Sequence, residues 1–141
     1  MNRSRPLKRT QLRRQSQAPR AKLDRALDRA LKRACGIMAG YKCAWCGRRV
    51  EYRDADPHHV LGQGSHPGRK WDVLNVVWCH RYGCHAQLHA FPGRLLELLK
   101  AQNGPRWRYY EEHRYEHGDG PVGLAAMRKR LGELKSIKVR E

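Results

Sequence analysis

Residues 43–89 contain four short stretches that decide the fold: CAWC at 43–46, DPHHV at 56–60, WDVLNV at 71–76 and CHRYGCHAQLH at 79–89. Together they contain four cysteines in two close pairs, two pairs of histidines (His58–His59 and His85–His89) and His80. Thiolates and neutral imidazoles are good ligands for zinc and for neighbouring transition metals. Four thiolates are enough to close one structural zinc site, so the histidines are left for something else. This order of residues therefore predicts two metal sites, one structural and one chemical.

The cysteines predict the structural site. Two residues separate Cys43 from Cys46 and four separate Cys79 from Cys84, so each pair can cover one side of a tetrahedral zinc ion. The alternative is four free buried thiols, which the paired spacing disfavours. The residues to which we assign chemistry lie between the pairs or just after Cys84, so the zinc would hold together a core too small to be stable alone. His80, inside the second pair, receives no role.

Composition indicates a nucleic-acid partner. The chain has 141 residues, enough for one domain with tails, and 30 Lys and Arg against 13 Asp and Glu give a net charge of +17. A charge of this size is strongly attracted to a polyanion such as DNA. A membrane partner is disfavoured because the sequence has no long apolar run and no basic helix with a bulky apolar face. Five cysteines, an odd number, without a secretory signal favour metal-bound thiolates in a reducing cytoplasm.

The chain divides into a basic tail and one domain. Residues 1–21 are rich in arginine and poor in apolar side chains, so we expect a disordered tail that binds phosphate through Arg9, Arg13 and Arg14. A merely solvated tail is the alternative. Residues 22–141 form the domain, with a core at 41–91 and flanking helices at 22–36 and 92–135.

Local patterns predict an α+β fold. Leucine at every fourth position supports the first helix, and Gly36 is expected to end or weaken it. Alternation in residues 49–53 predicts one strand, and the β-branched and aromatic residues at 73–78 predict a second. His85 and His89, four residues apart, would share one face of a helix. Pro121 is expected to open a last helix.

These stretches resemble the His–Asn–His (HNH) endonuclease motif of the ββα-metal superfamily in its zinc-stapled form. The resemblance covers about fifty residues: the cysteine pairs, the double histidine, the central asparagine and the final His-x-x-x-His occur in family order. A weaker similarity extends to phage recombination nucleases of the NinG and Rap type, through residues 55–59 and 69–72. The resemblance implies a ββα-metal core held by a zinc site of four cysteines.

The resemblance also implies roles for individual residues. His59 would be the general base, because the pKa of histidine lies near neutrality. His58, His85 and His89 would hold one divalent ion on the scissile phosphate. Asn75 would fix the loop that carries the base. Arg69 or Lys70 could meet charge developing on the phosphate, although a solvated loop cation is an equal alternative.

One departure from the family concerns the metal. Many members have a carboxylate where this chain has His58, and three imidazoles suit magnesium poorly. We therefore expect Mn²⁺, Ni²⁺ or Co²⁺ to support catalysis better than Mg²⁺, unless Asp56 supplies a carboxylate.

The leading functional hypothesis is a metal-dependent DNA endonuclease, encoded by a phage or mobile element, with a possible role in recombination, and acting in the cytoplasm of a bacterium or an infected host cell. The alternatives are a non-catalytic zinc module that binds nucleic acid and a structural or packaging partner with an inactive centre. A pure binding module has no need of a His–His pair followed by His-x-x-x-His. The sequence leaves open whether the chain is a monomer or a homodimer.

Overall fold

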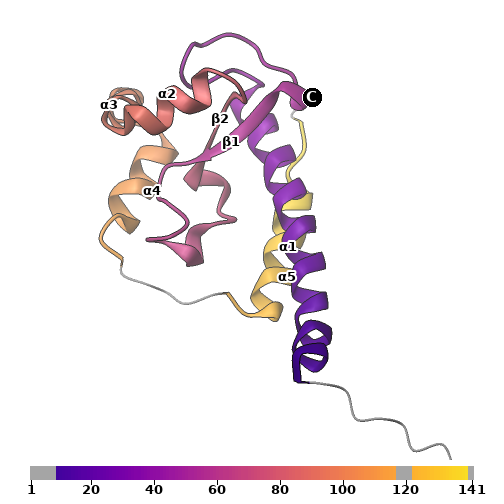
Figure 1. The fold of residues 1–141 in the computed structure, drawn as a ribbon. Helices are drawn as coiled ribbons and strands as arrows, with labels where there is room; N and C mark the ends of the chain where they lie inside the picture. Colours follow the sequence, from indigo (N-terminus) through magenta and orange to yellow (C-terminus); the bar gives the residue numbers. More distant parts are fainter. Residues whose placement is uncertain (1–8, 117–121, 140–141) are drawn as a thin grey trace, which may run out of the picture.

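The structure is a computed structural model that describes residues 9–116 and 122–139, with the backbone alone for residue 9 and residues 11–18. Within these residues five α-helices accompany one two-stranded antiparallel sheet, which confirms the α+β prediction (Figure 1). The elements are α1 (Arg9–Ala39), β1 (Ala55–His59), β2 (Val76–His80), α2 (Cys84–Ala90), α3 (Pro92–Gln102), α4 (Pro105–His113) and α5 (Leu124–Ser136). Three 3-10 helices, each of three residues, occur at Tyr52–Asp54, Pro67–Arg69 and Val73–Asn75.

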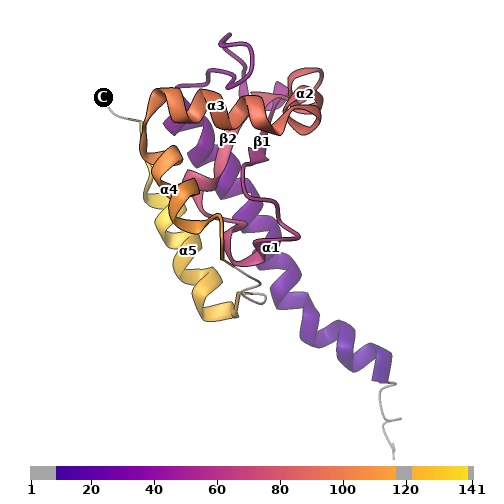
Figure 2. The same ribbon diagram turned by 90° about the vertical axis from the view of Figure 1, so that its left-hand side faces the viewer.

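Helix α1 is longer at both ends than the predicted helix over 22–36. Residues 9–21, expected as part of a disordered tail, have a helical backbone, and residues 1–8 lie outside the described residues. Leu27 and Leu31 are buried on the face of α1 that meets the core. Helix α5 lies alongside α1, and the first turns of α1 extend beyond the rest of the molecule (Figures 1 and 2).

Gly36 does not end α1, so of the two predicted effects, an end or a weak point, the first is wrong. A Cβ atom at this position would lie 3.1 Å from ring atoms of both Trp78 and Tyr41, so the glycine allows the helix to approach the buried Trp78 ring. The helix ends one turn later, at Ala39. There Gly40 has a φ of +59° and the backbone N–H of Tyr41 donates to the Gly36 carbonyl at 3.0 Å.

The sheet is displaced along the chain from its predicted position. Residues 49–53 are not a strand: Arg49 makes an isolated bridge with Lys42, and a 3-10 helix follows at Tyr52–Asp54. The first strand is β1, which pairs with β2 from Ala55 opposite His80 to His59 opposite Val76. Residues 73–75, predicted as strand, form a 3-10 turn that leads into β2.

Helices α2 to α5 complete the domain around the sheet. Leu88 of α2, Leu95 and Leu99 of α3, and Met127 and Leu134 of α5 are buried in one continuous core with Trp78. Pro121, expected to open the last helix, lies outside the described residues, and α5 begins at Leu124. Across residues 9–116 and 122–139, none of the helices combines the length and apolar character that crossing a membrane requires.

Candidate metal centres

Three histidine side chains meet where α2 packs against β1. His85 and His89 lie one turn apart on α2, and His58 lies on β1. One nitrogen from each ring lies within 4.8 Å of the others, and the Nε2 atoms of His85 and His89 are 3.1 Å apart. The structure thus brings together the three rings that the sequence grouped, because helical spacing aligns two of them and strand β1 presents the third.

The electrostatics of this cluster suit a cation. Burial, followed by the neighbouring imidazoles of His89 and His85, lowers the pKa of His58 to about 4, so this ring is neutral at pH 7. Within the described part of the chain, His58 Nδ1 is buried without a hydrogen-bond partner. A buried, unpartnered ring nitrogen beside two further imidazoles is a donor set that transition-metal ions satisfy.

Asp56 lies behind the cluster rather than within it. Its Oδ2 atom is 3.7 Å from His85 Nδ1, the ring nitrogen away from the His85–His89 contact. The Arg81 guanidinium donates to Asp56 Oδ1 at 3.3 Å. The alternative in which this carboxylate replaces an imidazole as a ligand is therefore not the arrangement seen. A carboxylate in this outer position orients a histidine ligand and raises its basicity.

His59, on the same strand, faces the loop that follows Gly68. Its Nε2 lies 2.8 Å from the Lys70 carbonyl oxygen, which can only accept, so Nε2 carries the hydrogen. Nδ1 is then the acceptor, and Gln63 Nε2 lies 3.3 Å from it. Burial is the largest influence on His59 and lowers its pKa, so the ring is neutral at pH 7.

A groove connects these histidines. His58, His59, His85 and His89 all line one cavity of about 440 Å³ that is open to solvent. His59 and the histidine cluster therefore share one concave surface, which is large enough for part of a polymeric substrate.

Asn75 is fully buried and ties the loop to the strand. Its Oδ1 accepts from the Leu61 N–H at 2.8 Å, and its Nδ2 donates to the carbonyls of Leu61 at 3.1 Å and Arg69 at 3.0 Å. These bonds hold the segment after β1 against the segment that ends at Lys70, whose carbonyl accepts from His59. The side chain satisfies buried backbone groups that would otherwise be unpaired.

The predicted phosphate-binding cations behave differently from one another. The Arg69 guanidinium donates to both carboxylate oxygens of Glu116, at 2.9 and 2.8 Å, and lies 3.4 Å from Asp72, so its charge is neutralised inside the protein. Lys70 keeps a weaker contact, 3.9 Å, with the exposed Asp28 carboxylate. Sequence reasoning could not foresee the Arg69 pair, because Glu116 lies 47 residues away. The other predicted phosphate contacts are Arg9, Arg13 and Arg14. Their side chains are not among those that the structure describes.

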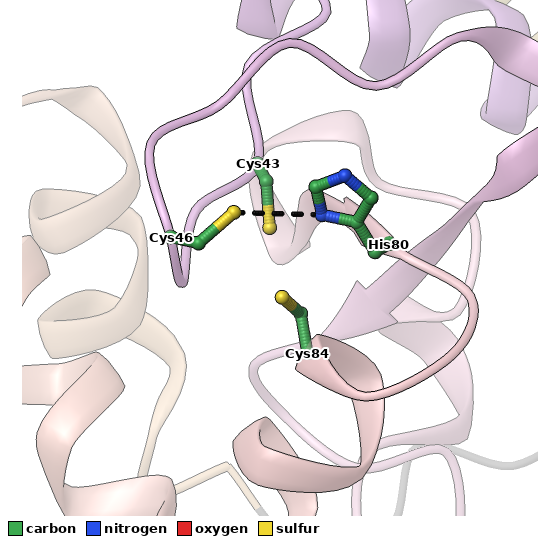
Figure 3. Close-up of side chains that lie close together, drawn as sticks. All are labelled: Cys43, Cys46, His80 and Cys84. Carbon is green, nitrogen blue, oxygen red and sulfur yellow. Dashed lines mark hydrogen bonds between the residues drawn. The ribbon is translucent and has the colours of Figure 1, made fainter.

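A second cluster, the cysteine–histidine cluster, contains three cysteines and one histidine, as Figure 3 shows. Cys43 and Cys46 come from the loop after α1, His80 ends β2 and Cys84 begins α2. The three Sγ atoms and one His80 ring nitrogen lie within 4.8 Å of one another, and Cys46 Sγ is 3.5 Å from His80 Nδ1. Three thiolates and one imidazole are a common set for a tetrahedral structural zinc ion. The cluster therefore suits structural zinc.

The backbone and the charges of this cluster favour a metal as well. Gly47 has a φ of +74° and its N–H donates to the Cys43 carbonyl, which closes the tight turn between the first two cysteines. Burial raises the pKa of Cys43, but hydrogen bonds from backbone groups of Cys46 and His80 outweigh it and the net shift is downward. Burial and the neighbouring thiols raise the pKa of Cys84. A bound cation would stabilise the thiolate forms of these cysteines, so metal binding would release the protons of the thiols.

Cys79, predicted as a zinc ligand, belongs to the core instead. Adjacent side chains on a strand tend to point to opposite faces, and of Cys79 and His80 on β2 only His80 lies among the other cysteines. Cys79 is fully buried, and its Sγ lies 3.2 Å from the Asp56 carbonyl across the sheet. The predicted site of four cysteines is thus corrected to a set of three cysteines and His80. Residues 76–79 are all buried, so no polar–apolar alternation in β2 indicated that His80 rather than Cys79 faces the other cysteines.

The pair β1–β2 followed by α2 has the strand–strand–helix order of a ββα-metal motif, with one histidine cluster where β1 meets α2. Comparison with known proteins gives no match: no family model, no curated protein and no solved structure matches the chain.

Proposed function

We propose that this chain is a metal-dependent endonuclease of the HNH type that hydrolyses phosphodiester bonds in DNA. The observation that carries the proposal is the groove, because it places an oriented, neutral His59 beside three converging imidazoles. A module that only binds nucleic acid needs neither feature. The net charge of +17 supports a polyanionic substrate and predicts binding that weakens steeply with salt.

The metal-binding residues of the proposed centre are His58, His85 and His89. An ion held there would supply Lewis-acid stabilisation to the scissile phosphate. The chain's own contribution is to present three neutral nitrogens, with burial keeping His58 unprotonated. Asp56, held in turn by Arg81, lies 3.7 Å from His85 Nδ1 on the outer side, where a carboxylate that closes to hydrogen-bond distance would orient the ring.

His59 is the proposed general base. Its bond to the Lys70 carbonyl places the hydrogen on Nε2 and leaves Nδ1 with a lone pair that can take a proton from water. Gln63, 3.3 Å from Nδ1, lies where that water would bind and can exchange its amide contact for one with the water. Asn75 positions the base, because it anchors the loop segments on both sides of the Lys70 contact.

Zinc in the cysteine–histidine cluster has a structural role in this proposal. His80 ends β2 and Cys84 begins α2, so an ion there would hold the turn between the second strand and the helix. That turn sets the position of His85, the next residue after Cys84. The structural site and the proposed catalytic site are therefore coupled through α2. The proposed setting, the cytoplasm of a bacterium or of an infected cell, agrees with reduced thiolates held by metal.

A plasmid assay tests the proposal. The parent protein is expected to nick supercoiled DNA with Mn²⁺, Ni²⁺ or Co²⁺, and the His59→Ala variant to be at least about 100-fold slower, the usual loss for a general base. Gln87→Ala is the matched control, because Gln87 is exposed on α2 between His85 and His89. This variant should cleave DNA as fast as the parent protein.

Two outcomes would contradict the proposal. If no divalent metal supports cleavage by the parent, the chain is not an endonuclease, and a zinc-stabilised nucleic-acid-binding module or packaging partner takes its place. If His59→Ala cleaves as fast as the parent, the general base has been misassigned.

A further inference from the structure

A second cavity adjoins the histidine groove. It has a volume of about 300 Å³, at the lower end of the range for small-ligand sites, and it is formed by the loop after β1 together with α3, α4 and the residues just after α4. Helices α3 and α4 pack against each other beside this loop (Figure 2). His58, Val60, Gly62 and Pro92 line both the cavity and the groove. A DNA strand with one phosphate bound in the groove would therefore bring its next nucleotide to this cavity.

One wall of the cavity is a stack of two tyrosines around an arginine. The Arg114 guanidinium lies 5.2 Å from the centre of the Tyr110 ring and 4.7 Å from that of Tyr115. Trp107 stacks on Tyr110 with ring centres 5.4 Å apart, which fixes the inner ring, whereas Tyr115 is 74% exposed. Aromatic rings and guanidinium planes are the surfaces on which proteins stack unpaired nucleobases.

Another lining residue of the cavity, His66, has a ring nitrogen without a partner among the residues that the structure describes. His66 lines the cavity, and its Nε2 is buried without a hydrogen bond within the described residues. Its Nδ1 lies 2.8 Å from Ser65 Oγ, which also lies 3.3 Å from the Gly62 carbonyl. The single serine hydrogen can go to either neighbour, so His66 Nε2 can carry a lone pair or an N–H. Because Nε2 is buried, the ring has to turn for this atom to reach a base in the cavity. The edge of a nucleobase offers both kinds of partner.

The occupant must also reach the cavity. A base inside a duplex is paired and stacked, and extracting it costs free energy, whereas an unpaired base is free to turn into a side pocket. The leucines of α3 give the cavity an apolar floor at Leu95, which suits a flat ring rather than a second phosphate.

We propose that this cavity, the base pocket, binds one unpaired nucleobase next to the scissile phosphate, so that the preferred substrate is single-stranded or locally unpaired DNA. This inference rests on the proposed function, because it assumes that the groove holds the phosphate that is cleaved. It adds the class of substrate. The recognition combines stacking on the exposed ring of Tyr115, which Arg114 supports from its other side, with a hydrogen bond to His66.

The test compares two oligonucleotides with the same number of phosphates, oligo-dT and a fully abasic strand. Binding is measured by fluorescence anisotropy with the full-length, zinc-loaded His59→Ala protein, which prevents hydrolysis. Oligo-dT is expected to bind at least about tenfold more tightly than the abasic strand. The added Arg114→Lys and Tyr115→Ala changes should remove most of this ratio, since they delete the stacking ring and the guanidinium that supports it while the positive charge is kept.

Tyr82→Ala is the matched control, because Tyr82 is 83% exposed and does not line the cavity, so it should keep the full ratio. His66→Ala should also lower the ratio. Equal binding of the two oligonucleotides, or an unchanged ratio in the Arg114→Lys, Tyr115→Ala protein, would overturn the inference. Because the readout is binding, plasmid nicking without base dependence would leave the nuclease proposal standing and remove only the base pocket. Base dependence without nicking would keep the base pocket and remove the nuclease.

Discussion

Replacing His80 or Cys79 by alanine separates the structural zinc ligands from the core. His80 is half-buried and lies with Cys43, Cys46 and Cys84, whereas Cys79 is fully buried on the other face of β2. His80→Ala should therefore weaken zinc binding with little cost in packing. Cys79→Ala should keep zinc and cost about 1 kcal/mol, because it leaves only a small cavity.

The expected loss in the free energy of unfolding of His80→Ala follows from the linkage between metal binding and folding. Loss of an outer-sphere partner of a metal ligand commonly weakens binding 10- to 100-fold, so loss of a direct ligand should weaken it by at least about 100-fold. At a fixed zinc concentration above both dissociation constants, a 100-fold increase in Kd lowers the free energy of unfolding by about 2.7 kcal/mol. With a chelator in excess the difference between parent and His80→Ala should disappear, since neither protein then binds zinc.

The assay is urea denaturation of the parent and both variants, with zinc and with chelator, together with the zinc content after dialysis. The reasoning is refuted if Cys79→Ala loses the metal while His80→Ala retains it at parental affinity. A loss of stability in His80→Ala of equal size with and without zinc would also refute it, because the histidine would then act through packing.

Three further predictions concern the proposed catalytic centre. Nickel, cobalt or manganese should support faster plasmid cleavage than magnesium, and a metal titration with equal or higher rates in magnesium would contradict the three-imidazole assignment. Asp56→Asn should weaken cobalt binding at the histidine cluster by about 10- to 100-fold, measured by calorimetry on the zinc-loaded protein, without changing the content of structural zinc. Because burial lowers the folded-state pKa of His58 to about 4, the unfolded chain binds more protons between about pH 6.5 and 4, so stability should fall as the pH falls through this window. His58→Gln should flatten that dependence in urea denaturation, and an equally steep profile in the variant would rule out His58 as its source.

The alignment of His85 with His89 was accessible from the sequence because its geometry is local, whereas His58 was grouped with them through the resemblance to the HNH motif. His85 and His89 are one helical turn apart, so any helix over residues 84–90 aligns them, and His58 needs only to lie on a neighbouring strand. The role of Asn75 came from the same resemblance, and its hydrogen bonds to Leu61 and Arg69 agree with it.

The choice between Cys79 and His80 was decided by tertiary structure. Both occur at a spacing that suits zinc, and only the packing of β2 against the core determines which side chain faces the other cysteines. Tertiary structure also decided the role of Arg69. The sequence suggested a free charge there, but folding brings Glu116, from a distant segment, into an ion pair with it. Short stretches of sequence determine which metal-ligand types are present and the periodicity of the apolar residues. The face a strand turns inward and the partner a charge meets depend on contacts between residues far apart, which no local pattern contains.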